Sequence, residues 1–262
     1  MPAPTPKLKA ASVVTEVNDI LRAATHYLGQ DDPRVSRLMH DAESMIKVDP
    51  AEAYSVMGCV SQLVGDYEKA IYSIDNAIKL APSRFGYLLN KCGYLLNLGF
   101  FADAQSVFDQ VARPELGMFT RAWNHGYVCG AFESMVRHLE KARLMQLDLE
   151  GLDIQTAQKA AKVLEAKRVS QSDVGFFLNI AGSVLREHKL FYLGLVPSVH
   201  VVDDPDSDWF ISISYDVGVP LSKAHELYSK LIDQLVGHAP VAPQILSVSF
   251  RSGGEQYERS AA

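Results

Sequence analysis

A recurrence at a spacing of 34 residues constrains the fold of this 262-residue chain more than any other feature. The recurring residues are a glycine, an aromatic, an alanine and a large apolar residue. They are Gly65, Tyr67, Ala70 and Ile74, followed by Gly99, Phe101, Ala104 and Phe108. A period of this length is typical of helical repeats, in which one helix pair cannot bury its apolar face alone and stacks on its neighbours. Because such stacks usually hold partners, the recurrence favours binding over catalysis.

Composition narrows the class of protein. The chain is 48% hydrophobic, which is enough for one large or two modest cores. Its formal net charge is -6, and a mildly acidic chain lacks the positive surface of a general nucleic-acid binder. The basic residues at positions 137–143 are interrupted by Glu140, as on a solvated helix face. We therefore expect no nucleic-acid partner.

Cysteine usage and the N-terminus indicate the compartment. Cys59, Cys92 and Cys129 are an odd number with no close pair, which argues against a disulfide framework or a zinc site. Each falls in the first helix of a successive unit, where a small apolar side chain fills a gap between helices. Residues 1–10 contain no apolar core segment, so we expect them to be disordered and not a signal peptide. No run approaches the ~18 apolar residues of a membrane span, and we expect a cytoplasmic protein.

Helical periodicity extends over residues 11–189. Apolar spacing predicts a helix from Ala11 to about Leu28. A second helix is predicted to start at Asp31-Asp32-Pro33, because proline is tolerated in a first turn, and to end near Asp49-Pro50. Together these helices would form a first helical hairpin.

The segment from Ala51 to Arg84 resembles the tetratricopeptide repeat (TPR) family. The matching residues are Tyr54, Met57, Gly58, Gly65, Asp66, Tyr67, Ala70, Ile74, Ala77 and Pro82. Ser61 departs from the pattern, since the family usually has tyrosine there. In this arrangement Gly58 and Ala70 let two helix backbones approach closely. The resemblance is clear over residues 51–112, while a third unit at 115–147 and the hairpin before Ala51 are degenerate.

Two further helices follow the repeats. Apolar spacing predicts one helix around residues 154–164 and another around 176–185, with Ser170 and Asp173 as a capping pair. We expect this pair to be a last hairpin that caps the stack, because terminal repeats tend to be atypical.

The pattern changes after Lys189. Valines at 199–202, the alternating run Phe210–Tyr215 and a last apolar run at 245–250 predict strands, and residues 221–236 predict a helix that stops at Gly237. We therefore expect a mainly α chain, with a TPR-like solenoid over 11–189 and a small β-β-α-β module over 190–252. This module resembles no family. Residues 253–262 are expected to be a flexible tail.

No catalytic or metal motif stands out. Asp204, Asp206 and Asp208 have the spacing that opens a calcium loop, but Trp209 and Tyr215 occupy the positions that require glycine and an acidic residue. The eight histidines form no helical metal pair, and neither a Gly-x-Ser-x-Gly turn nor a Walker-type loop occurs. We expect no enzymatic activity, cofactor or metal.

The TPR resemblance implies a binding surface on the first helix of each hairpin. The implied concave-face residues are Ser55, Cys59, Gln62, Tyr87, Asn90, Lys91, Tyr94, Asn97, Asn124 and Tyr127. Tyrosine and asparagine combine apolar area with adaptable hydrogen bonds, which suits peptide recognition. Asn90, Lys91 and Asn124 are similar to part of the clamp with which some family members grip a C-terminal carboxylate. The alternative is an ordinary polar surface.

Two functional hypotheses remain open. In the first, the chain is an adaptor, scaffold or chaperone-like protein that holds a protein or peptide segment in its groove. In the second, the C-terminal module is the functional part, as a ligand sensor or a toxin-neutralising or regulatory unit, and the helices are its scaffold. In the first hypothesis the C-terminal sheet would fix the end of the stack, extend the interface or mediate self-association; in the second, the sheet edge could pair with a strand of a partner.

Overall fold

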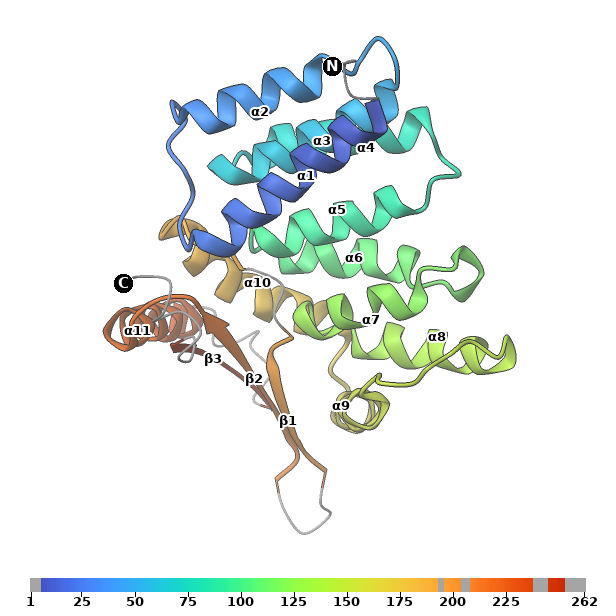
Figure 1. Ribbon diagram of the computed structural model, residues 1–262. Helices are drawn as coiled ribbons and strands as arrows, with labels where there is room; N and C mark the ends of the chain where they lie inside the picture. Colours follow the sequence, from blue (N-terminus) through green and yellow to red (C-terminus); the bar gives the residue numbers. More distant parts are fainter. Residues whose placement is uncertain (1–5, 193–195, 204–207, 238–244, 253–262) are drawn as a thin grey trace.

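The computed structural model describes residues 6–192, 196–203, 208–237 and 245–252, and this part of the chain is mainly helical (Figure 1). These described residues form eleven α-helices and a three-stranded sheet. The strands come after the tenth helix, and the eleventh helix lies between the second and third strands. The mainly α fold class with a small C-terminal sheet is therefore confirmed. The expected tail at 253–262 and residues 1–5 of the N-terminus lie outside the described residues.

Six consecutive helices form three stacked pairs. They are α3 (Pro50–Ser61) with α4 (Tyr67–Leu80), α5 (Gly86–Asn97) with α6 (Phe101–Val111), and α7 (Phe119–Val128) with α8 (Phe132–Leu144). Short 3-10 turns follow α3 (Gln62–Val64) and α6 (Pro114–Leu116). Gly65 and Gly99, from the recurring pattern, adopt φ values of 69° and 71° in the turns that close the first two pairs, a conformation that glycine adopts at little cost. The 34-residue recurrence therefore corresponds to successive helix pairs.

Close packing inside the first pair depends on a small residue. A Cβ atom on Gly58 would lie 3.0 Å from the Ala70 carbonyl oxygen and 3.1 Å from the Tyr94 ring. Ala70 itself is fully buried. The predicted contact between the backbones at Gly58 and Ala70 is confirmed.

The N-terminal helices differ in extent from the sequence-based prediction. Helix α1 (Pro6–Ala23) begins inside the segment expected to be disordered, so that expectation is wrong for residues 6–10. The reason is packing, because the buried residues Val13, Val17 and Leu21 share a core with α3. Helix α2 (Pro33–Glu43) starts as predicted, with the Asp32 side chain accepting a hydrogen bond from the Arg34 amide, but ends six residues early.

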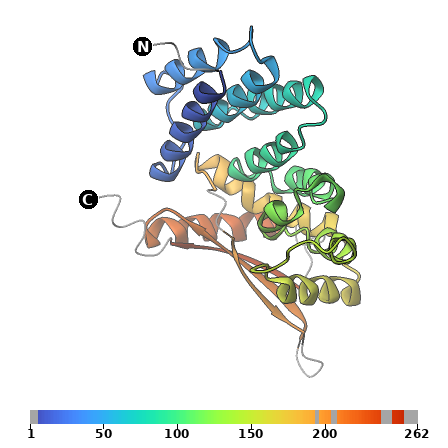
Figure 2. The ribbon, with the colours of Figure 1, turned by 45° about the vertical axis from the view of Figure 1, so that its right-hand side comes forward.

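The expected capping hairpin after α8 is wrong. Helix α9 (Ile154–Lys167) packs on α8, whereas α10 (Gln171–Glu187) turns back across the stack and packs on α6. Val174 and Leu178 of α10 lie against Gly130, the glycine of the α7–α8 turn. The predicted capping box of Ser170 and Asp173 is present at the start of α10. Figures 1 and 2 show α10 between the stacked pairs and the C-terminal unit.

The C-terminal unit has the predicted β-β-α-β order. Strands β1 (Ser198–Val202), β2 (Phe210–Val217) and β3 (Leu246–Ser252) lie side by side in that order, and α11 (Leu221–Gly237) connects β2 to β3. Strands β1 and β2 are antiparallel, and β2 and β3 are parallel. Residues alternate along β2 between buried and half-exposed, as the sequence pattern predicts.

The buried face of the sheet belongs to the helical core. The hydroxyl of Tyr215 donates a hydrogen bond to the Val128 carbonyl at 2.7 Å, and its ring stacks on Phe101 with centroids 5.1 Å apart. The apolar residues of β2, β3 and α11 form one cluster with those of α5–α10. The expectation that the small unit packs on the helices is confirmed, while its other face carries partly exposed Ser212 and Ser214.

Candidate functional site

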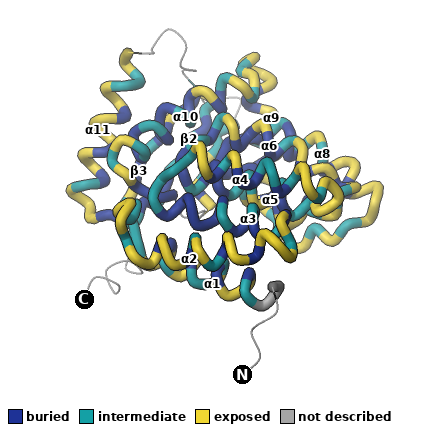
Figure 3. Tube along the Cα trace, turned by 90° about the horizontal axis from the view of Figure 1, so that it is seen from above, coloured by how far each residue is buried: buried dark blue, intermediate teal, exposed yellow. Residues whose placement is uncertain are grey.

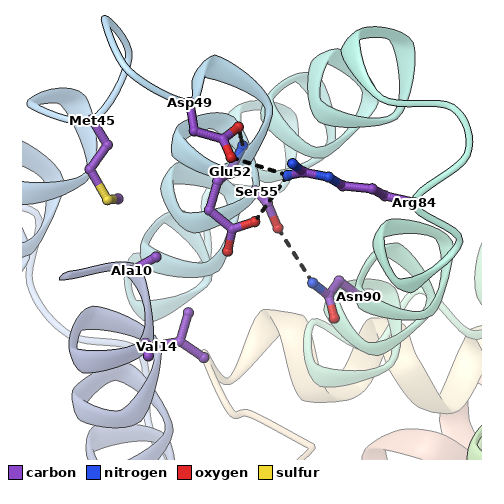
Figure 4. Close-up of a pocket in the computed structure, with 9 residues that line it drawn as sticks. Ala10, Val14, Met45, Asp49, Glu52, Ser55, Arg84 and Asn90 are labelled. Carbon is purple, nitrogen blue, oxygen red and sulfur yellow. Dashed lines mark hydrogen bonds and ion pairs between the residues drawn. The ribbon is translucent and has the colours of Figure 1, made fainter. Parts of the chain in front are cut away.

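An open cavity of about 540 Å³ lies between α1, α3 and α5, on the side of the stack formed by the first helices of the pairs (Figure 4). One wall is apolar and the other is polar. The lining residues are Ala10, Ala11 and Val14 of α1, Met45 before α3, Asp49, Glu52 and Ser55 at the start of α3, and Arg84 and Asn90 at the start of α5. This cavity is our candidate functional site.

The start of α3 places the acidic side chains. Asp49 caps the helix, since its carboxylate accepts a hydrogen bond from the Glu52 amide at 3.1 Å, and Pro50 occupies the first helical position. Glu52 and Ser55 are three residues apart, so their side chains lie on one face of α3. That face is directed towards the cavity.

Arg84 joins the two carboxylates across the cavity. Its guanidinium Nη1 lies 3.2 Å from Asp49 Oδ2 and 3.7 Å from Glu52 Oε2. The same nitrogen donates to the Tyr87 hydroxyl at 2.8 Å, and that hydroxyl donates to Glu52 at 2.9 Å. Among the described residues that line the cavity, Arg84 is therefore the cation that contacts both carboxylates.

The network also shifts the acidity of its members. The hydrogen bonds to Tyr87 and Asp49 raise the pKa of Arg84 above its usual range, so it stays charged. Burial is the main cause that raises the pKa of Tyr87 to about 12. Tyr87 is therefore a neutral hydrogen-bonding group at neutral pH, and not a candidate base.

A row of hydrogen bonds joins α3 to α5 beneath the cavity. Asn90 donates to Ser55 Oγ at 3.4 Å, Tyr94 donates to the Ser55 carbonyl at 2.9 Å, and Asn97 donates to Gln62 Oε1 at 3.0 Å. Because these partners satisfy each other inside the chain, the row fixes the distance between the two helices that form the cavity.

The structure divides the predicted concave-face residues into groups. Six are buried and offer little surface to a partner: Ser55, Cys59, Gln62, Tyr87, Tyr94 and Tyr127. Lys91 and Asn97 are half-buried, and Asn90 and Asn124 are exposed. Of these ten residues, Ser55 and Asn90 line the cavity. The family resemblance predicts which helix face could bind a partner, but it does not predict which side chains on that face are exposed to solvent.

The carboxylate clamp implied by Asn90, Lys91 and Asn124 is not assembled. Lys91 Nζ bonds Asp75 Oδ1 of α4 at 2.6 Å and does not line the cavity. Asn90 lies beside the carboxylates of Asp49 and Glu52, which would repel a C-terminal carboxylate. The chemistry of the cavity therefore differs from that of such a clamp.

Sequence reasoning missed Asp49, Glu52 and Arg84, together with the α1 wall. Asp49-Pro50 and Glu52 carried a recognisable signal, because an acidic cap followed by proline marks a helix start. The α1 wall was missed because Ala10 fell in the segment expected to be disordered. The spacing of apolar residues back from Val17 through Val13 to Ala10 could have extended that helix.

The described residues form other cavities as well. A second open cavity, of about 510 Å³, lies between α8 and α9 and is lined by Glu133, Arg137, Lys162 and Glu165 among others. Within the described ranges no cluster of histidine, cysteine, aspartate or glutamate could hold a metal, and none of the helices there has the length and apolar composition of a membrane span. Asp204 and Asp206 of the candidate calcium loop lie outside those ranges.

Comparisons with models of protein families, with curated proteins and with solved structures found no match to this chain.

Proposed function

We propose that this chain is a non-catalytic interaction protein, of an adaptor, scaffold or chaperone-like kind, that binds a segment of a partner protein in the cavity between α1, α3 and α5. The observation that carries the proposal is the cavity itself, which is open to solvent and has an apolar wall facing a polar one. Three buried, free thiols suit a reducing cytoplasm.

A TPR-like interpretation of the stack supports the same function. The close contact at Gly58 and the glycine turns at Gly65 and Gly99 fit the spacing of that family. In such proteins the first helices of the pairs form the binding surface, and α3 and α5 are in that position here. We extend the proposal to α1, which supplies the opposite wall.

The charges of the cavity suggest the chemistry of the partner segment. Of the described residues that line the cavity, Asp49 and Glu52 are acidic and Arg84 is basic, and acidic side chains attract a lysine or arginine side chain. Ala10, Ala11 and Val14 offer apolar surface to a neighbouring small side chain. We therefore expect a segment that combines a basic residue with small apolar residues.

Affinity capture followed by a matched pair of variants tests the proposal. The purified chain is used to capture a partner from native cell lysate, and the partner is identified by mass spectrometry. Asn90→Trp fills the cavity from an exposed position, and we expect it to weaken binding at least about tenfold. Gln110→Trp, on the exposed surface of α6, is the control and should bind normally. Equal binding by Asn90→Trp and Gln110→Trp would show that the partner binds outside the cavity.

The C-terminal unit is the second candidate, favoured by the partly exposed serines on the open face of its sheet. Because Tyr215 and Phe101 share a core, deleting residues 191–262 would uncover helical side chains. A substitution on the open face is the cleaner test. If Ser212→Lys abolishes capture and Asn90→Trp does not, the sheet is the binding surface.

A further inference from the structure

Helix α11 carries an apolar stripe that the rest of the described chain does not cover. Leu221, Tyr228, Ile232 and Val236 are 60%, 40%, 40% and 70% exposed, and they recur at helical spacing on one flank. The face that packs on the sheet is a different one, made of the buried residues Ala224, Leu227 and Leu231. Apolar side chains thus occupy about half of the helix circumference, and only part of that arc is buried.

The exposed flank lies on the outer side of the molecule. Lys223 and Gln234 of α11 bond His188 and Ser183 of α10, and these contacts place α10 on the opposite flank of α11 from the stripe. Figure 3 shows α11 at the periphery, with β3 and α10 on its inner side. The stripe therefore lies beside the outer edge of β3.

That edge is open to pairing. Among the described residues β3 pairs with β2 alone. The amide of Ile211 donates to the Ile245 carbonyl at 2.8 Å, so along β3 the odd-numbered residues direct their backbone groups to β2. Leu246, Val248 and Phe250 then direct theirs outward. The strand, LSVSFRS, lacks proline, and its one charged side chain, Arg251, is paired with Asp216 of β2.

The strand is complementary to a second copy of itself. In an antiparallel pair centred on Ser249, Val248 faces Phe250 of the other copy and Ser247 faces Arg251, so no like charges meet. The outward backbone groups of Val248 and Phe250 are opposite each other in this register, as antiparallel hydrogen bonding requires.

The same twofold axis brings the α11 stripes together. Ser252 Oγ donates to the Val219 carbonyl at 3.0 Å, so the end of β3 lies at the start of α11. Ser249, in the middle of β3, is then level with Tyr228 and Ile232 near the middle of α11. One rotation axis therefore serves the strand and the helix at once.

We propose that two copies of this chain form a dimer in which their β3 strands pair antiparallel about Ser249, giving a continuous six-stranded sheet, and the exposed flanks of their α11 helices pack together. The inference concerns a surface away from the cavity and does not depend on the function proposed for it. In this dimer the second copy covers both the exposed apolar flank of α11 and the outer edge of β3.

Sedimentation velocity on the full chain, from low to high micromolar concentration, tests the proposal. We expect the unmodified chain to be a dimer. Ile232→Asp should weaken association at least about a hundredfold, because it brings a charge into the apolar contact. Leu144→Asp, at an 85% exposed position of α8, is the matched control and should leave the dimer intact.

Charge pairs at the axis test the register. Ser249→Lys and Ser249→Glu each place like charges opposite each other and should weaken association about tenfold, whereas an equal mixture of the two variants should form a heterodimer. A chain that stays monomeric at every concentration would overturn the proposal, as would a dimer unaffected by Ile232→Asp. Failure of the mixture to associate while Ile232→Asp disrupts the dimer would overturn the strand pairing. Circular dichroism melting curves identify any Ser249 variant that fails to fold. In that case the effect of Ile232→Asp on association is the test of the proposed dimer.

Discussion

The backbone of Gly182 on α10 lies directly against that of Gly99 in the α5–α6 turn. A Cβ on Gly99 would lie 2.9 Å from the Gly182 carbonyl oxygen, and one on Gly182 would overlap the Gly99 carbonyl. Arg186, one turn further along α10, donates a hydrogen bond to the same Gly99 carbonyl. The position of α10 therefore depends on the absence of a side chain at two glycines.

Gly182→Ala tests this contact. We expect the substitution to lower the free energy of unfolding by about 2–3 kcal/mol, because the added methyl group forces two backbones apart. The measurement is urea denaturation followed by circular dichroism. Gly86→Ala is the control, since nothing lies within 4 Å of a Cβ there, and it should stabilise the chain slightly. Similar effects of the two changes would contradict the close approach.

The bond from Tyr215 to the Val128 carbonyl ties the sheet to the helices. We expect Tyr215→Phe to cost about 1–2 kcal/mol, because the buried carbonyl loses its donor. Thermal and urea unfolding measure the change. Tyr72→Phe, at a 65% exposed tyrosine of α4, provides the comparison, and a loss of equal size there would argue against a specific role for the Tyr215 hydroxyl.

Because His125 on α7 is largely buried, we expect the free energy of unfolding to fall at acidic pH. Burial lowers its pKa from 6.5 to about 4, so the unfolded chain takes up the proton first as the pH falls. The stability that the neutral ring contributes is complete above pH 6.5 and is lost as the pH falls towards 4, on the order of 3 kcal/mol. Urea titrations across this range should show a shallower pH dependence in His125→Gln. An unchanged slope would assign the acid sensitivity to other groups.

The three thiols should resist modification in the folded chain. Burial raises the pKa of Cys59 and Cys129 to about 12 and that of Cys92 well above its usual value. The thiolate is the reactive form, so we expect an aromatic disulfide reagent at pH 8 to label the native chain at least about a hundredfold more slowly than the unfolded chain. Rapid labelling of one thiol without denaturant would show that its helix pair opens.

Local patterns in the sequence predicted the elements well. The capping pair Ser170 and Asp173, the alternation along β2 and the glycine turns each depend on neighbours within a few residues, so a single sequence carries the signal. Gly58 was predictable for a different reason, because the residues of the TPR pattern paired it with Ala70.

Long-range partners were less predictable. Helical spacing shows that α10 has apolar faces but not which element each face meets, and the expected hairpin with α9 was wrong for that reason. Gly175 and Gly182, seven residues apart on α10, were the available signal for a close crossing. The candidate cavity was missed for a related reason, because α1 supplies one wall from a segment far away in the sequence.

Helix α10 also has a mechanical consequence. Its Gly182 is in contact with the turn at Gly99, and Ser183 of α10 and His188 at its C-terminal end bond α11. Because α10 contacts both the α5–α6 turn and α11, a rotation of the α5–α6 pair would displace α10 and, with it, the C-terminal unit.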